Sequence, residues 1–123
     1  MRKFLLKFLL TLSVFISLSN YSNSQIVISQ VYGGGGNSGA TYTHDFIELF
    51  NRGTSAVSIA GWSIQYTSSA GTTWQKTDLS GTLLPGQYYL IQQAQGAGGT
   101  TALPTPDVTG TIAMSGTNGK VVL

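Results

Sequence analysis

Apolar residues recur at every second position along most of the chain. Runs rich in Val, Ile, Thr and aromatic residues alternate with clusters of Gly, Ser, Asn and Pro, which is typical of strands joined by turns and not of helices. Short strands repeated at this spacing indicate an all-β sandwich or barrel. The pattern predicts strands at residues 25–32, 43–51, 56–59, 62–68, 72–78, 87–93, 111–114 and 120–123.

The polar segments between these runs predict particular connections. Asn118 and Gly119 tolerate positive φ, so they predict a hairpin turn between the last two strands. Pro85 has a preset φ and Gly86 can adopt a left-handed backbone, a combination that favours a type II turn. Residues 95–107 form the longest connector, and their glycines and two prolines argue against regular structure. We expect this connector to cross from one sheet to the other.

A glycine-rich stretch, "YGGGGNSGATY" at residues 32–42, lies between the first two predicted strands. A phosphate-binding loop needs a Lys-Ser/Thr pair at the start of a helix, and glycine-rich calcium repeats need aspartates in register. The stretch has neither. It is therefore predicted to be a flexible loop between strands.

Trp62 is the strongest candidate for the centre of the core. Residues 62, 64 and 66 of a strand lie on one face, which groups Trp62 with Ile64 and Tyr66. Buried tryptophans stabilise a core by several kcal/mol, since replacing one with alanine costs ~3–5 kcal/mol.

The first 24 residues have the layout of a secretory signal peptide. Two basic residues near the start precede an apolar stretch at 4–18, and Ser22 and Ser24 supply small residues before a cleavage site. The alternative is an uncleaved membrane anchor, but the stretch is shorter than the ~20 residues that a span requires. We therefore expect export, to the cell surface or the medium, of one domain at residues 25–123, with no stable membrane span after cleavage.

Signal cleavage changes the charge of the domain. Its cations are Arg52, Lys76 and Lys120, against four acidic residues, so the formal charge falls from +2 to −1. Nucleic-acid affinity depends mainly on Lys and Arg that neutralise phosphates, so this domain alone is not expected to bind nucleic acid. Cysteine is absent, which excludes disulfides and a lipid anchor on cysteine.

An ordered set of segments is similar to a known family. "IVISQVYGGG" (26–35) is followed by "DFIELFNRG" (45–53), then "SIAGWSIQ" (58–65) and "LLPGQYYLIQ" (83–92). Over residues 26–123 the chain resembles the lamin tail domain family, particularly its exported bacterial members. The resemblance implies an immunoglobulin-like β-sandwich and a non-enzymatic module. The positions that match its structural motif are Asp45, Glu48, Asn51, Gly61, Trp62, Pro85 and Gly86.

The resemblance departs from the family at one end. In the family, a strand like "KVVL" (120–123) is usually followed by a turn and one further strand, whereas the sequence ends at Leu123. We therefore expect either a fragment whose sandwich lacks its last strand, or a resemblance that weakens here. An unpaired edge strand left in this way invites association.

Glu48 lies within an apolar strand, between Phe46 and Phe50 on one face. One interpretation is a general base or metal ligand with a raised pKa. Acid–base catalysis needs a second titratable group nearby, and the sequence places none at a suitable spacing. We therefore expect a structural carboxylate that accepts backbone N–H bonds from a neighbouring loop or pairs with Arg52.

The sequence gives little support for a metal site or a catalytic motif. Zinc requires three or four ligands, and the chain has one histidine, His44, and no cysteine. Calcium could use Asp45, Asp107 and loop carbonyls, but their spacing matches no known calcium loop. The sequence also lacks the Gly-x-Ser-x-Gly elbow of esterases. We expect no catalytic residue, no metal and no cofactor.

Four aromatic residues are the remaining binding candidates: Tyr32, Tyr42, Trp74 and Tyr89. Exposed rings can stack on sugars, bases or other proteins. Because strands favour aromatic residues, packing within the domain is the expected role for most of them.

Three functions are compatible with these observations. The favoured one is an exported interaction or structural module that contacts an unknown protein or cell-surface partner. The alternative is an N-terminal accessory domain of a secreted nuclease or phosphoesterase, because exported domains of this family often precede such enzymes. Direct binding of DNA or polysaccharide is the third, and the net negative charge argues against DNA.

Overall fold

The structure is a computed structural model that describes residues 24–123, in which every regular element is a β-strand. This confirms the predicted all-β class. The predicted signal peptide lies, apart from its last residue, outside the described residues. The strands are β1 (Ile26–Tyr32), β2 (His44–Asn51), β3 (Val57–Ser58), β4 (Ser63–Thr67), β5 (Gln75–Asp78), β6 (Thr82–Leu83), β7 (Tyr88–Gln95), β8 (Val108–Thr109) and β9 (Lys120–Val122).

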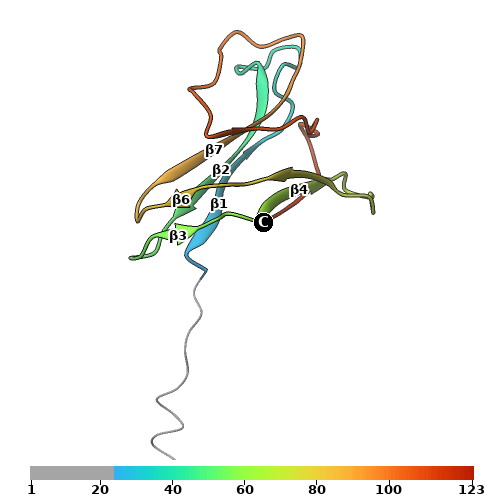
Figure 1. Ribbon diagram of the computed structural model, residues 1–123. Coiled ribbons are helices and arrows are strands. Elements are labelled where there is room, and N and C mark those ends of the chain that lie inside the picture. The colour runs from blue at the N-terminus through green and yellow to red at the C-terminus, as the bar shows by residue number, and fades with distance from the viewer. Residues whose placement is uncertain (1–23) are drawn as a thin grey trace, which may run out of the picture.

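The strands form three sheets arranged as a sandwich (Figure 1). The largest has the order β1-β2-β7-β8, in which β1, β2 and β7 are antiparallel and β8 runs parallel to β7. A three-stranded sheet, β5-β4-β9, and a two-stranded sheet, β3-β6, supply the facing side. The central strand β2 is therefore hydrogen-bonded on both sides, by β1 and by β7.

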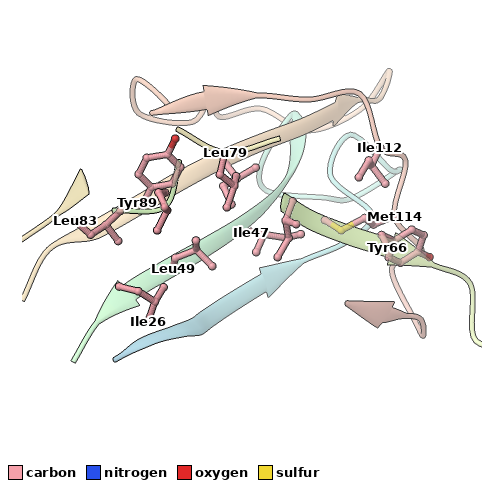
Figure 2. Packing of buried hydrophobic residues seen from close by; sticks show 12 residues of the cluster. Ile26, Ile47, Leu49, Tyr66, Leu79, Leu83, Tyr89, Ile112 and Met114 are labelled. Atoms are coloured by element: carbon pink, nitrogen blue, oxygen red, sulfur yellow. The ribbon is translucent and has the colours of Figure 1, made fainter. Parts of the chain in front are cut away.

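One continuous core lies between the sheets (Figure 2). Ile47 and Leu49 of β2 and Ile91 of β7 are fully buried, as are Ile64 and Leu83 from the facing sheets. The alternation predicted for the strands therefore holds, because every second side chain of β2 and β7 points inward. Full burial of one such aliphatic side chain stabilises the fold by roughly 1.5–3 kcal/mol.

The predicted strand at 111–114 is not a strand. Ile112 and Met114 are both buried, as the apolar alternation predicts. The amide of Ile112, however, donates to Oε1 of Gln93 at 3.0 Å, and the amide of Met114 donates to Oδ2 of Asp45 at 2.7 Å. Buried side chains thus replace the partner strand, which hydrophobic periodicity does not reveal.

Two predicted connections are also wrong. Residues 95–107 do not cross between sheets, because they lead from β7 back to β8 in the same sheet. The crossing is made by the segment between β8 and β9, which joins the large sheet to the three-stranded sheet. Asn118 and Gly119 form no hairpin turn, since β9 pairs with β4 and neither residue has a positive φ.

The glycine-rich stretch is a connector between β1 and β2, as predicted, but it is packed closely against its neighbours. Gly35 and Gly36 are buried. A Cβ on Gly35 would lie 2.0 Å from the carbonyl carbon of His44, and one on Gly36 would lie 2.2 Å from the Cα of Gly96. These glycines are needed for close approach of backbones.

Trp62 is not at the centre of the core, and this expectation was wrong. Its side chain is 39% exposed, whereas Ile64 and Tyr66 on the same face of the strand are buried. Trp62 lies one residue before β4, at the exit of a turn in which its amide donates to the Ile59 carbonyl at 3.0 Å. Gly61 occupies that turn with φ +83°. The tryptophan is therefore at the end of the sheet, where the facing layer covers it only in part.

Tryptophan fluorescence tests this placement, because Trp62 and Trp74 are the two tryptophans of the chain and are exposed to similar extents, 39% and 40%. We expect the folded protein to emit near the wavelength of the unfolded chain and to be quenched readily by acrylamide. The Trp74→Phe and Trp62→Phe variants separate the two signals. Blue-shifted emission that resists quenching in Trp74→Phe would show that Trp62 is buried after all.

Candidate functional site

Asp45 is a buried carboxylate at the start of β2. It is only 3% exposed, and both of its oxygens accept backbone amides. Oδ1 accepts from Gly35 in the glycine-rich loop, and Oδ2 accepts from Met114 in the segment that crosses between the sheets. Charge-assisted bonds to backbone amides are stronger than neutral ones. Asp45 therefore fixes two irregular segments to the central strand.

Asn51 has the same role at the other end of β2. Its side chain is fully buried, and Nδ2 donates to the carbonyls of Ser55 and Leu83, both at 2.9 Å. Oδ1 accepts the amide of Gly53 at 2.9 Å. The donors and the acceptor of the amide are all used, so Asn51 joins the loop after β2 to the strand β6.

The predicted turn at Pro85 and Gly86 is confirmed and is attached to Asn51. The amide of Gln87 donates to the Leu84 carbonyl at 3.0 Å, and Gly86 has φ +75°, as a type II turn requires. The amide of Gly86 also donates to the Asn51 carbonyl at 2.8 Å. Two parts of the sequence motif that lie far apart in the chain are thus in direct contact.

Glu48 lies on the outer face of the large sheet and binds Ser29. The Ser29 hydroxyl donates to Oε1 of Glu48 at 2.7 Å. Ser29 has this reach because the pairing of β1 with β2 shifts between Ile28 and Gln30, which leaves Ser29 as the extra residue of a bulge. The partner of the Glu48 carboxylate is therefore a serine hydroxyl, and not a loop amide or Arg52, the two partners that we expected.

The remaining titratable residues are dispersed. The Asp107 carboxylate accepts the Leu90 amide at 2.7 Å, and the exposed Asp78 pairs with Lys76 at 2.8 Å. His44 Nδ1 is 2.9 Å from the Thr43 hydroxyl. Across residues 24–123 no three His, Cys, Asp or Glu side chains come together as a metal site would need.

A buried polar network centred on Gln93 of β7 was not predicted from the sequence. Gln93 is almost fully buried, its Nε2 donates to the Thr77 hydroxyl at 3.0 Å, and its Oε1 accepts the Ile112 amide. Gly110 packs directly against the Thr77 and Gln93 side chains. A Cβ at this position would lie 2.2 Å from the Thr77 hydroxyl oxygen and 2.3 Å from Oε1 of Gln93. A signal was present, because Gln93 follows Tyr89 and Ile91 at inward-facing positions of one strand.

Aromatic residues pack mainly against one another on the outer face of the large sheet. Tyr32 stacks on Phe46 with centroids 5.2 Å apart, and Tyr42 meets Phe46 edge-on at 5.7 Å. Tyr89 is buried, and its hydroxyl donates to the Ser80 carbonyl at 2.9 Å. Trp74 remains exposed. Packing, the expected role, accounts for three of the four candidates.

Two hollows lie on either side of Tyr66, Met114 and Ser115, which line both. The larger, about 690 Å³, lies beside the connector from β4 to β5 and is lined largely by hydroxyl and amide side chains. The smaller, about 220 Å³, lies between Val31 of β1 and Val121 of β9. Neither lining contains a carboxylate, histidine, lysine or arginine.

The model of one family, described as Lamin Tail Domain, matches residues 19–123. No curated protein matches the chain. The described residues contain no helix that is long and apolar enough to cross a membrane.

The structural role of Asp45 predicts a large difference between two aspartates. Asp45→Asn replaces one acceptor with an NH₂ group that faces a backbone amide, so we expect the free energy of unfolding to fall by about 2–3 kcal/mol. Asp78→Asn is the matched control, because Asp78 is exposed and forms only a surface ion pair, and we expect it to leave stability nearly unchanged. Urea unfolding of both variants measures this. Equal effects of the two substitutions would show that Asp45 does not hold the loops.

Proposed function

Because the chain belongs to the lamin tail domain family, we propose that it is an exported, non-catalytic module that binds or positions another molecule. Membership supports an immunoglobulin-like interaction or structural domain. Export and the absence of catalysis go beyond what family membership supports. The first is based on the layout of residues 1–24, and the second on the use of the polar side chains in the motif.

One observation carries the non-catalytic part of the proposal. The polar residues of the motif use their side chains to fasten the scaffold: Asp45 binds two backbone amides, and Asn51 binds two carbonyls and one amide. A general acid or base must instead be free to reach a substrate. The two hollows beside Tyr66 have uncharged linings.

The distribution of charge favours a protein or a neutral cell-surface polymer as the partner. After removal of residues 1–24 the chain has three cations and a formal charge of −1. Lys76 pairs with Asp78, and Lys120 donates to the Gly71 carbonyl at 3.0 Å. Phosphate binding needs clustered cations, so nucleic acid is not the partner that we propose.

Export is tested by expressing the full chain in a Gram-negative host and measuring the mass of the product in each cell fraction. We expect a species that begins at Gln25, in the periplasm or the medium, because residues 1–24 are removed on translocation. Replacing apolar residues of the stretch 4–18 with aspartate serves as the control and should retain the uncleaved chain in the cytoplasm. A full-length chain that stays in the cytoplasm without this change would contradict export.

The absence of catalysis is tested with the purified protein in the presence of Mg²⁺ or Ca²⁺. We expect no hydrolysis of plasmid DNA or of a chromogenic phosphodiester above the rate of the Glu48→Gln variant. Glu48 is chosen because it is the partly exposed carboxylate of the motif, and its replacement should leave the fold intact. A hydrolysis rate that is tenfold or more lower in Glu48→Gln than in the unchanged protein would contradict the proposal. Such a difference corresponds to ~1.4 kcal/mol in the activation barrier.

A further inference from the structure

We infer that Gln25 is a modification site: once residues 1–24 are removed, its side chain closes onto its own α-amino group to give pyroglutamate, which lies against Gly53 at the start of β1. The inference rests on the proposed export, because only a glutamine at the N-terminus has a free α-amino group, and it goes beyond that proposal. Two independent observations carry it. Ser22 and Ser24 place the cleavage site directly before Gln25, and the glutamine side chain lies over a glycine.

Gln25 is held at the margin of the large sheet. Its carbonyl accepts the amide of Arg52 at 2.8 Å. The next residue, Ile26, is the first of β1, pairs with Asn51 and is only 3% exposed (Figure 2). Ser24, on the other side, is exposed. A chain that begins at Gln25 therefore has its α-amino group beside the sheet and not at the end of a tail.

Ring closure is an exchange of one amide for another within Gln25. At neutral pH an α-amino group is partly unprotonated and is then a nucleophile. The α-nitrogen attacks Cδ, the bond from Cδ to Nε2 breaks, and Nε2 leaves as ammonia with the proton that the α-nitrogen loses. The product is a five-membered lactam whose nitrogen is an uncharged amide. The step consumes no other reactant.

The leaving group is not engaged elsewhere in the described part of the chain. Gln87 and Gln93 use their side-chain amides to bind backbone amides, those of Leu84 and Ile112. The side chain of Gln25 forms no such bond within residues 24–123, and its exposure is intermediate. Loss of Nε2 therefore breaks no contact that holds the fold.

Gly53 leaves room for the ring. A Cβ at this position would lie 3.0, 2.7 and 2.8 Å from Cβ, Cγ and Cδ of Gln25. These three carbons are the side-chain members of the lactam, so they already lie where a side chain at residue 53 would intrude. Glycine allows this close approach. The carbonyl of Gln25 stays outside the ring, so its bond to the Arg52 amide is retained.

The ring changes what the start of β1 presents to other proteins. The terminus loses its charge, as it does on acetylation. Aminopeptidases bind a free α-amino group, so they no longer remove Gln25 and reach the next residue. That residue, Ile26, belongs to the core, and protection of the terminus therefore protects the packing of the large sheet.

The test uses the full chain expressed in a Gram-negative host, from which the exported product is purified. We expect its N-terminal peptide to begin at Gln25 and, during incubation at neutral pH, to become lighter by the mass of one ammonia. Glutaminyl cyclase, which catalyses the same ring closure, should bring this loss to completion in the folded protein. A peptide that begins at Gln25 and keeps its ammonia in the presence of the cyclase overturns the inference.

The Gln25→Asn variant is the matched control. It keeps a side-chain amide, but the lactam that it would form is one atom smaller and strained. We therefore expect its N-terminal peptide to keep its ammonia and its free α-amino group under both treatments, and an aminopeptidase to shorten this variant but not the cyclised protein. Equal loss of ammonia from the N-terminal peptides of both proteins would show a different reaction and overturn the inference.

Amide shifts of the ¹⁵N-labelled protein locate the ring. Cyclisation should move the amides of Ile26 and Gly53 and leave that of Gly116 unchanged, because Gly116 lies beside Gly34, beyond the opposite end of β1. An unchanged Gly53 amide in the cyclised protein would show that the ring does not lie there and overturns the inference.

The outcomes separate this inference from the proposed export. An exported chain that begins at Gln25 and does not cyclise overturns the inference alone, as does an exported chain that begins at another residue. An uncleaved chain that stays in the cytoplasm contradicts export, and the inference with it.

Discussion

The buried carboxylate of Asp45 holds together two segments that have no regular structure of their own. Its oxygens accept the amides of Gly35 and Met114, which are separated by most of the domain in sequence. A buried backbone amide without a partner costs about 1–3 kcal/mol, so neither segment could be buried at this position without such an acceptor. The glycine-rich loop and the crossing segment thus depend on one side chain of the central strand.

The same arrangement recurs along β2 and β7. Asn51 supplies bonds to the loop after β2 and to β6, and Gln93 supplies one to the amide of Ile112. Short sheets leave long connectors whose backbone groups need partners. In this fold inward-facing polar side chains, and not further strands, meet much of that need. A scaffold of this kind leaves the outer faces and edges for contacts with other molecules, which agrees with an interaction module.

The main strands could be predicted because alternating apolar residues and turn residues indicate them directly. The family could be predicted because an ordered set of sequence segments resembles it. The failures have a common cause. Residues 111–114 alternate like a strand, but Gln93 and Asp45 bind their amides in place of a partner strand. Trp62 lies on the same face as Ile64 and Tyr66, as expected, but the turn at Gly61 places it at the end of its sheet. Ser29 could not be identified as the partner of Glu48, since a bulge is a property of pairing between strands and not of either strand alone.

Native-state hydrogen exchange of single amides is the most direct measurement of the central claim. The account predicts that the amides of Gly35 and Met114, although outside any strand, exchange about as slowly as those in the middle of β2, because both are buried and bound to Asp45. In the Asp45→Asn variant both should become much faster together. Rapid exchange of these two amides in the native protein, at the rate of the exposed Gly116 and Thr117, would contradict the account.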